Sequence, residues 1–515
     1  MPGKTTMPYS YADSSEPVPS RSTFNVSENH KTTFDASALV PIYWDFLYPG
    51  EVRRGRTKMF VRLSNPLDFP LMDNLYITVH WFSVAIRNIW DNYRKFFGER
   101  ENPGDSIDYT LPIFATGVTA LNGDSLPQRL SDHLGLPHVA GFTPEDAHCL
   151  AHRAYYSIWN YWYRDSSIDD SLTLATDDGP DTLATDYALQ FRRKRFDYFT
   201  GLLPQPQRGE SVTIGGEVAI DQGGAGIIGV RSTTIDEIRR IDTAATHADV
   251  SGTNALEAEL LYPNTTINEL RNAVAIQQFL ERDNRAGQLF GDLIRAHYGA
   301  NFLDAKYAPS FIAGGREPMM FQALPNVSAE SGPTGSEQAL GELGAIGTGV
   351  FDGANFTYRC TEPEILMGIV SIDADLTYHQ GLNRKFSYRT RYDFMYPEFQ
   401  GIGDQAVLKK ELYWSGGATD EDVLGYGPRY EECRVGINRL SREFRPDYAT
   451  PLDTWHLAED FASQPSLNST FLQSTPPVNR VVKVSSVDNF IADIRCEQYS
   501  TKALSLRGVP GLGRL

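Results

Sequence analysis

The sequence predicts a mainly β protein, an antiparallel sandwich whose strands are joined by long loops. Several segments alternate apolar and polar residues with a period of two, which places successive side chains on opposite faces of a sheet. These segments lie far apart in the 515 residues, without the helices of roughly 10–15 residues that connect the strands of a parallel sheet. The 43 glycines and 30 prolines are spread along the chain and indicate many turns.

The composition excludes several classes of protein. Hydrophobic residues make up 41% and charged residues 22%, as in globular proteins, so the chain is neither disordered nor fibrous. A net charge of −18 argues against a nucleic-acid-binding surface over the whole molecule, because phosphate contacts need Lys and Arg; a local basic patch stays compatible with it. The four cysteines form no CxxC pair and suit a reducing compartment. We find neither the apolar stretch of a signal peptide nor a run of membrane-spanning length, so folding in the cytosol is expected.

The expected elements begin with an N-terminal arm over about residues 1–28, which is rich in Pro, Ser and Thr and too poor in apolar residues to fold alone. Alternation then predicts strands at 58–63 and 75–82 and, much later, at 371–379 and 490–496. The connections between these strands must hold the loops and helices.

Two helices are expected in those connections. The first runs from Thr143, as N-cap, to about Tyr163, with Pro144 at its first position. The second begins with a capping box at Thr266. Each carries one apolar stripe, so both are expected to pack against a core. The stripe of the first helix contains His148, His152, Tyr155, Trp159 and Trp162, and that of the second contains Ile276, Leu280, Phe290 and Ile294.

Two glycine-rich stretches interrupt this pattern. Residues 209–265 hold clusters of glycine and few aromatic residues, which indicates an insertion. Residues 328–353 have the same character and are expected to form a flexible loop. Compact domains keep such long loops where the loops serve binding or assembly.

Three motifs suggest enzyme or metal chemistry, and each has a plainer explanation. Residues 224–229 spell GxGxxG, but no further βαβ unit follows, so a loop is favoured over a dinucleotide site. His148 and His152 have the i, i+4 spacing of a helical metal pair, yet they continue an aromatic stripe, which favours packing. Asp373 and Asp375 could act as the paired carboxylates of a hydrolase, but a solvated strand face is favoured.

The strongest basic run is Arg192, Arg193, Lys194 and Arg195, which lies between two phenylalanines. Cations next to aromatic residues can contact the backbone and bases of a nucleic acid. Neighbours in a strand point to opposite faces, so only half of the four could face one partner. We expect a local contact site for DNA or for a neighbouring subunit, with a solvated role or an intersubunit salt bridge as the alternative.

Several longer segments carry more information than these motifs. They are HKTTFD at 30–35, LYPGE at 47–51, PLMDNLY at 70–76, IWDNYRKFFGERENPGD at 89–105, FDYFTGLLPQPQRG at 196–209, LRNAVAIQQFLERDNRAG at 270–287, ADLTYHQGLNRKFSYRTRYDFMYP at 374–397, LDTWHLAEDF at 452–461 and GVPGL at 508–512. In this order along nearly the whole chain, they resemble the major capsid protein of gokushovirus-type microviruses, small bacteriophages with single-stranded DNA genomes.

This resemblance implies a viral jelly-roll β-barrel, antiparallel and eight-stranded, with long inter-strand loops that contain several helices. Residues 1–515 would form a single jelly-roll capsid domain, with the extra length in loops. The implied function is that of a structural protein without catalytic residues, which self-assembles into an icosahedral shell around circular single-stranded DNA. Long loops suit this role because most of the intersubunit surface must come from them.

The resemblance also implies that the insertion at 209–265 forms a surface protrusion that contacts the host. The positions expected there are Gly223, Gly224, Gly226, Gly229, Thr233 and Thr234. The implied partners are other copies of the chain, packaged single-stranded DNA, a small basic DNA-binding phage protein, a pilot protein and a receptor on the host-cell surface. No cofactor is implied, and a structural divalent cation between subunits is left open. The expected location is the virion, after assembly in the cytoplasm of the bacterial host.

Two other classes of function stay open from the residues alone. A jelly-roll carbohydrate-binding protein or glycosidase would explain the aromatic residues and the paired acids, and it predicts a monomer or small oligomer. A nicotinamide-dependent enzyme would use the GxGxxG motif and predicts dinucleotide binding. Homogeneous particles of megadalton size would exclude the first class, and failure to bind a dinucleotide would exclude the second.

Overall fold

The computed structural model describes residues 21–115, 123–139, 142, 146–209, 229–231, 238–240, 267–300, 306–325, 330–331, 337–338, 343–484 and 486–506. The chain divides into two compact units, a larger one of Met1–Pro204 with Asn301–Leu515 and a smaller one of Gln205–Ala300. The insertion predicted at 209–265 falls within the range of the smaller unit.

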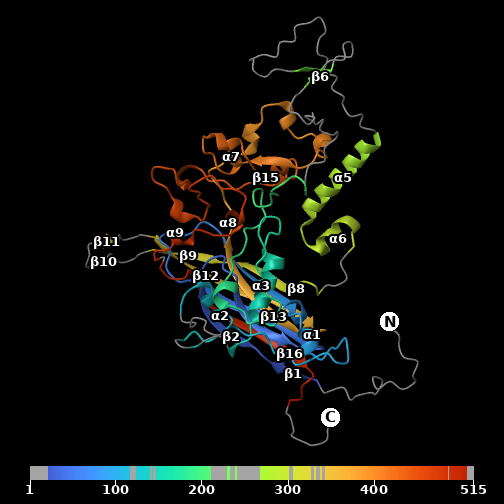
Figure 1. The fold of residues 1–515 in the computed structure, drawn as a ribbon. Coiled ribbons are helices and arrows are strands. Elements are labelled where there is room, and N and C mark those ends of the chain that lie inside the picture. The colour runs from blue at the N-terminus through green and yellow to red at the C-terminus, as the bar shows by residue number, and fades with distance from the viewer. Residues whose placement is uncertain are drawn as a thin grey trace, which may run out of the picture. The chain divides into compact units, whose positions relative to one another are not determined.

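The larger unit contains two antiparallel sheets (Figure 1). The first sheet has the order β1-β16-β4-β12-β9, with β2 also paired to β16, and the second has the order β3-β13-β5-β8. The strands of the first sheet are β1 (Ser22–Asn25), β2 (Glu28–Phe34), β4 (Val52–Leu63), β9 (Met320–Pro325), β12 (Leu343–Arg359) and β16 (Phe490–Lys502). The strands of the second sheet are β3 (Val40–Leu47), β5 (Leu75–Ala85), β8 (Ser310–Pro318) and β13 (Glu364–Ala374).

The strand order is that of a jelly roll. Two sets of four strands, β2-β16-β4-β12 and β3-β13-β5-β8, form the sandwich, and the chain crosses from one sheet to the other at most of its connections. Two Greek keys produce this order. The predicted mainly β, antiparallel, eight-stranded jelly roll is therefore confirmed, with β1 and β9 added to the first sheet.

The facing sides of the two sheets form the main core. Met59, Val61 and Leu63 of β4 point inward and are buried. From the opposite sheet, the indole nitrogen of the fully buried Trp81 donates a hydrogen bond of 3.0 Å to the hydroxyl of Thr57. This bond satisfies a buried N–H group and joins the two sheets inside the core.

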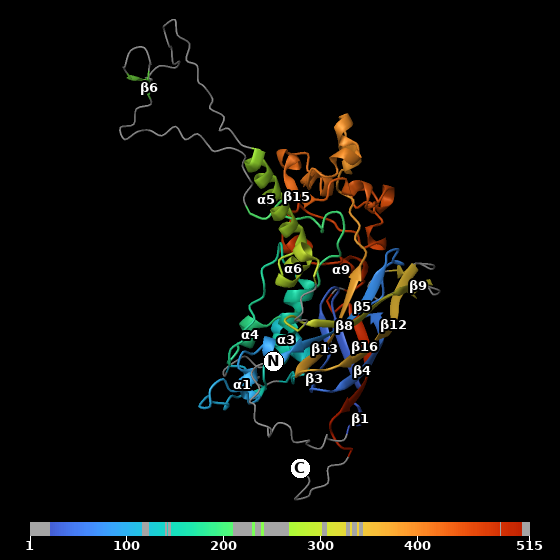
Figure 2. The same ribbon diagram turned by 90° about the vertical axis from the view of Figure 1, so that its right-hand side faces the viewer.

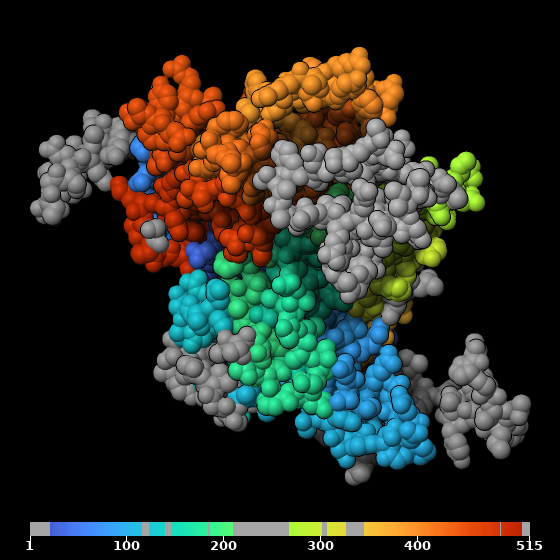
Figure 3. Space-filling model, turned by 45° about the horizontal axis from the view of Figure 1, so that its top comes forward, coloured from blue at the N-terminus to red at the C-terminus, as the bar shows by residue number. Residues whose placement is uncertain are grey.

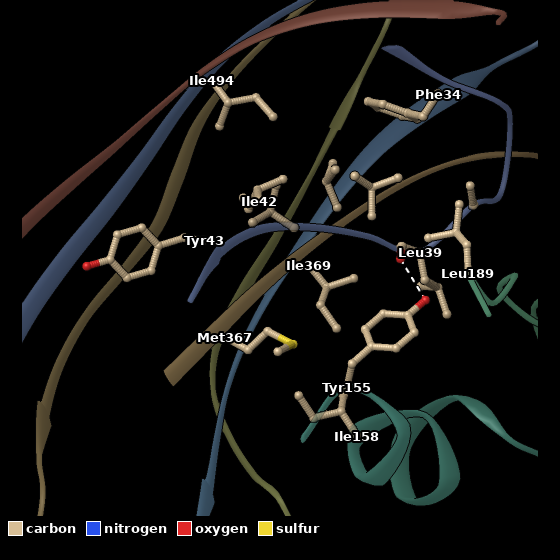
Figure 4. Packing of buried hydrophobic residues seen from close by; sticks show 14 of the residues in the cluster. Phe34, Leu39, Ile42, Tyr43, Tyr155, Ile158, Leu189, Met367, Ile369 and Ile494 are labelled. Carbon is tan, nitrogen blue, oxygen red and sulfur yellow. Dashed lines mark hydrogen bonds between the residues drawn. The ribbon is translucent and has the colours of Figure 1, made fainter. Parts of the chain in front are cut away.

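The central strands β13 and β5 of the second sheet are buried on both faces, and the helix α3 (Leu150–Ile158) packs against their outer side. Tyr155 and Ile158 of α3 lie beside Met367 and Ile369 of β13, and the Tyr155 hydroxyl donates a hydrogen bond of 2.8 Å to the carbonyl of Leu39 (Figure 4). Figure 2 shows the layers in turn, from α3 through β13 to β16 and β4. Every residue of β13 is buried, so its sequence is a nearly continuous apolar run without alternation.

The first sheet shows the opposite pattern. In β4 and β16, inward-facing residues are buried and the residues between them are partly or fully exposed along the whole strand. This is the physical origin of the period of two in the sequence. The strands predicted at 58–63, 75–82 and 490–496 are confirmed as parts of β4, β5 and β16. The strand predicted at 371–379 is wrong in position, because β13 ends at Ala374 and its doubly buried first half carries no alternation.

The flexible loop predicted at 328–353 is wrong for residues 343–353, which belong to β12 and pair with β9 and β4. The glycines of this stretch mark close packing. A Cβ atom on Gly349 would lie 2.6 Å from Cδ1 of Ile77, and one on Gly347 would lie 2.7 Å from Cδ1 of Leu63. Glycine at these positions makes room for large buried side chains, one from β5 of the facing sheet and one from the neighbouring strand β4.

Two other predictions change at their boundaries. The arm predicted for about 1–28 includes β1, whose residues pair with β16; residues 1–20 lie outside the described residues. The predicted first helix begins at Leu150, because His148 forms a β-bridge with Ile113, and it continues as a π-helix over Trp159–Tyr163. The expected N-cap, Thr143, lies outside the described residues.

Shorter elements complete the larger unit, and a second apolar core forms around Phe199, Tyr378 and Leu412. No helix among the described residues is long and apolar enough to span a membrane. The remaining helices and strands are α1 (Tyr93–Phe96), α2 (Leu126–His133), α4 (Leu183–Asp186), β10 (Glu330–Ser331), β11 (Glu337–Gln338), β14 (Gln405–Leu408), α7 (Lys409–Leu412), β15 (Val423–Gly427), α8 (Ser469–Leu472) and α9 (Val478–Val481).

The smaller unit contains α5 (Ile267–Ala286), α6 (Phe290–Tyr298) and the paired strands β6 (Gly229–Arg231) and β7 (Ile238–Arg240). The second predicted helix is therefore two helices, and the rings of Phe279 and His297 stack between them at 4.6 Å. No residue of α5 or α6 is buried, so the expected packing of this stripe against a core is wrong: the two helices cover only parts of each other. Thr266, the expected cap, lies outside the described residues.

Candidate functional site

Two cations of the basic run at 192–195 contact a buried carboxylate, that of Asp373 on β13. Asp373 Oδ1 lies 3.3 Å from Nη1 of Arg192, and its Oδ2 lies 3.1 Å from Nη2 of Arg316 and 3.6 Å from Nε of Arg195. The hydroxyl of Thr78 on β5 donates a further hydrogen bond of 3.1 Å. The solvated strand face expected for Asp373 is therefore wrong: its side chain is 3% exposed and is surrounded by three guanidinium groups.

The other two cations of the run also have partners within the chain. Nε of Arg193 lies 2.7 Å from the carboxylate of Asp169. Nζ of Lys194 lies 3.1 Å from Glu459 and 4.7 Å from the centre of the Phe471 ring, and the Lys194 side chain is only 2% exposed. Burial raises the pKa of Glu459, and the neighbouring Lys194 opposes this shift.

These contacts make the run a structural cluster that joins distant parts of the chain. Arg195 has the most exposed charge of the four, with 42% of its side chain accessible. The contact with DNA or a neighbouring subunit stays a prediction for this run. It has least support at Lys194, because a buried, paired ammonium would have to leave its partner to meet a phosphate.

His148 and His152 are packed among aromatic rings, as their stripe predicted. The His148 ring lies 5.8 Å from that of Trp44, and the His152 ring lies 5.0 Å from that of Phe114. Nε2 of His152 lies 3.0 Å from the hydroxyl of Ser131, and burial lowers the pKa of this histidine to about 3. Among the residues that the structure describes, no three His, Cys, Asp or Glu side chains form a group suited to a metal ion.

A buried ion pair that the sequence analysis missed lies on the same helix. Arg153 of α3 contacts Asp181 through two parallel hydrogen bonds, and the Tyr187 hydroxyl donates a third to the same carboxylate. Burial raises the pKa of the nearby Cys149 thiol, with the hydrogen bond to Asp181 adding to the shift. All four cysteines are free thiols. No local pattern indicates this pair, because its two members lie on different segments.

Residues 384–402, which we call the aromatic loop, expose several large apolar side chains on the larger unit. The chain of this loop is coloured orange at the surface in Figure 3. Arg384 anchors one end, with Nη1 3.0 Å from Oε1 of Glu411, whose Oε2 accepts a hydrogen bond of 2.8 Å from the Tyr198 hydroxyl. The side chains that project are Phe386, Tyr392, Phe394, Met395, Tyr396 and Ile402, which are between 40% and 79% exposed. Apolar patches of this kind mark protein interfaces.

The predicted protrusion is mostly outside the described residues. Gly223, Gly224, Gly226, Thr233 and Thr234 lie there, as do five residues of the GxGxxG motif. Gly229 is the first residue of β6 and pairs with Arg240. Host contact at these positions stays a prediction.

Jelly rolls occur in viral coat subunits, and exposed apolar surface on long loops suits contacts between subunits. Residues 15–512 match the family described as capsid protein (F protein), and the chain belongs to that phage capsid family. It is 34% identical to capsid protein VP1 of Bdellovibrio phage phiMH2K over 95% of both chains. It is 29% identical to capsid protein VP1 of Chlamydia phage 1 over 96% of both, and 26% identical to that of Spiroplasma virus 4 over 94% of both.

The family defines a structural major capsid protein of the microvirus type, a component of the virion and not an enzyme. The resemblance found in the sequence is thereby confirmed. The carbohydrate-binding and nicotinamide-dependent alternatives gain no support, since Asp373 is held by arginines and the chain belongs to a capsid family.

Proposed function

We propose that this subunit assembles into a small icosahedral shell that encloses a circular single-stranded DNA genome. The observation that carries the proposal is the aromatic loop: Phe386, Tyr392, Phe394 and Ile402 expose more than half of their surface on a well-packed unit. Burying each such side chain contributes roughly 1.5–3 kcal/mol, which favours association of subunits. Closed symmetry around fivefold and threefold axes would cover the loops of every copy.

The test is to express the full-length chain and examine the product by size-exclusion chromatography and negative-stain electron microscopy. Homogeneous closed particles, with circular single-stranded DNA recovered from those made during infection, are the expected result. A monomer or small oligomer at every concentration would refute the proposal.

We further propose that residues 209–265 form the protrusion that contacts the host-cell receptor. These residues belong to the long connection between β5 and β8, outside the strands of the sandwich, so they can change without disturbing the core. Replacing residues 215–260 by a short Gly-Ser linker is expected to leave shells intact and to reduce attachment to host cells. Loss of assembly by a folded subunit would contradict an exterior position.

The partners proposed for the shell follow from its charge. The chain carries −18, so neutralising a packaged genome requires local basic patches, cations or a separate small basic protein. A pilot protein for genome delivery and a divalent cation between subunits remain part of the proposal. Mass spectrometry of purified virions would identify the two proteins, and elemental analysis of the same particles would detect the cation.

A further inference from the structure

We infer that the outward face of the first sheet binds single-stranded nucleic acid; this deepens the proposed function, on which it rests, by naming the surface that meets the genome. The face is built from alternate residues of β2, β4, β12 and β16. It holds seven cations and three carboxylates, so it carries a net charge of +4 in a chain whose total is −18. We call it the basic sheet face.

The strand geometry of β4 gathers these charges. Arg54, Arg56, Lys58 and Arg62 are separated by even numbers of residues, so they project from the same side of the sheet. Two residues of a strand span about 6.8 Å, which is comparable with the spacing of phosphates along an extended single strand. The residues between them, such as Met59 and Val61, are buried in the core. The charges are therefore in a row on a rigid element.

The neighbouring strands neutralise only part of this row. Arg56 lies 2.6 Å from Asp352 of β12, and Lys58 lies 3.0 Å from Glu497 of β16, which also pairs with Arg495. The other four cations have no ion pair within the described residues, and all four are exposed. They are Lys31, Arg54, Arg62 and Arg359.

Two exposed aromatic rings stand among these cations. Phe60 lies on β4 between Lys58 and Arg62 and is 48% exposed. Tyr499 of β16 lies opposite Arg54 and is 47% exposed. Aromatic rings beside cations stack the bases of a single strand, whereas the bases of a duplex are already stacked on each other. Phosphate contacts and base stacking together identify the ligand as a single strand.

The contrast between the two sheets supports a partner at this face. α3 covers the outer side of the second sheet, whereas alternate residues of β4 remain exposed on the first. An acidic surface of another subunit is the competing occupant, since the chain as a whole is acidic. Such a partner would satisfy the cations but gives no role to exposed stacking rings, and the experiment separates the two.

The experiment measures binding of a fluorescent oligothymidylate to the full-length subunit before assembly, over a range of salt concentrations. Replacing three unpaired arginines, R54Q/R62Q/R359Q, is expected to reduce the salt slope by about 2, since each phosphate contact on a single strand contributes about 0.7. The matched control is R100Q/R271Q/R282Q, which removes three exposed arginines that are not part of β2, β4, β12 or β16 and should leave the slope unchanged. Equal slopes for the two variants would overturn the inference.

A second measurement needs no arginine variant. Irradiating the unmodified subunit with a 5-iodouracil oligonucleotide should cross-link Phe60 or Tyr499, as identified by mass spectrometry, and F60L should weaken binding at least about 5-fold. Cross-links confined to other segments would overturn the inference. Loss of shell assembly in R54Q/R62Q/R359Q without any change in oligonucleotide binding would instead identify an intersubunit contact. Electron microscopy of the same preparations tests shell formation separately, so failure of the proposed function and failure of this inference are distinguishable.

Discussion

Arg153 and Asp181 form a buried ion pair with two parallel hydrogen bonds. Nη2 of Arg153 lies 2.6 Å from Oδ1 of Asp181 and Nε lies 2.8 Å from Oδ2, and the two side chains are 0% and 2% exposed. Nη1 donates two further hydrogen bonds, to the carbonyls of Ile89 and Asp177. The pair therefore fixes α3, which covers the second sheet, to the loop around residue 181.

We expect R153M to lower the free energy of unfolding by about 3–5 kcal/mol, because Asp181 would keep a buried charge without its partner. Urea denaturation of the full-length subunit measures this change. The matched control is R434M, which breaks the exposed pair of Arg434 with Glu431 and should change stability by no more than about 0.5 kcal/mol. Similar losses in both variants would contradict the importance of burial.

One buried histidine, His152, and two half-buried ones, His80 and His133, predict a loss of stability in acid. Burial lowers the pKa of His80 and of His133 to about 4 and that of His152 to about 3. In the unfolded chain these groups titrate near 6.5, so at lower pH the unfolded state binds more protons and the free energy of unfolding falls. The fall should be about 1.4 kcal/mol per pH unit for each histidine between about pH 6.5 and about pH 4.

Urea midpoints measured between neutral and mildly acidic pH give this slope. H133Q keeps a hydrogen-bonding side chain. It should reduce the dependence of the free energy of unfolding on pH by the contribution of one histidine, about 1.4 kcal/mol per pH unit. H138Q changes an exposed histidine and is the control. A slope that stays the same in H133Q would show that other groups cause the acid sensitivity.

Two of the strands that the sequence predicts, β4 and β16, have one face in water, whereas β5 was predicted although it is buried along nearly its whole length. β4 and β16 alternate because one side of the first sheet is exposed, and both were predicted. β13 and most of β3 carry no such signal, because they are buried between the first sheet and a helix, α3 over β13 and α2 over β3. The glycines of β12 suggested a loop, since nothing local shows that Ile77 and Leu63 occupy the space beside them.

The candidate functional site, too, could be predicted only in part from the sequence. The basic run was visible in the sequence, but its partners Asp373 and Glu459 are distant along the chain, so its internal role was not. The basic sheet face had a local signal that was missed: cations at four of the five alternate positions of β4 from Arg54 to Arg62, with Phe60 at the fifth. Period-two cations within a predicted strand are the pattern to search for.

A third prediction tests the packing that positions the aromatic loop. A Cβ atom on Gly381 would lie 1.9 Å from the carbonyl oxygen of Glu411 and 2.8 Å from the backbone of Leu412. G381A therefore forces the backbone to move and should lower the free energy of unfolding by about 1–3 kcal/mol. G436A, where a Cβ atom meets nothing within 4 Å, is the control for the loss of a glycine. Equal stability of the two variants, by thermal unfolding, would contradict this packing.

The last prediction concerns assembly through the aromatic loop. F386S/Y392S/F394S should leave thermal unfolding of the subunit nearly unchanged, because the three side chains are 79%, 57% and 57% exposed. Burying each ring between subunits stabilises the contact by roughly 1.5–3 kcal/mol, so the association constant should fall at least about a thousandfold. Shell yield against protein concentration, followed by light scattering, measures this fall. The variant F386L/Y392F/F394L keeps most of the apolar surface and should still assemble, which separates loss of apolar contact from loss of shape. Normal shell yield in the serine variant would mean that the aromatic loop lies outside the subunit contacts.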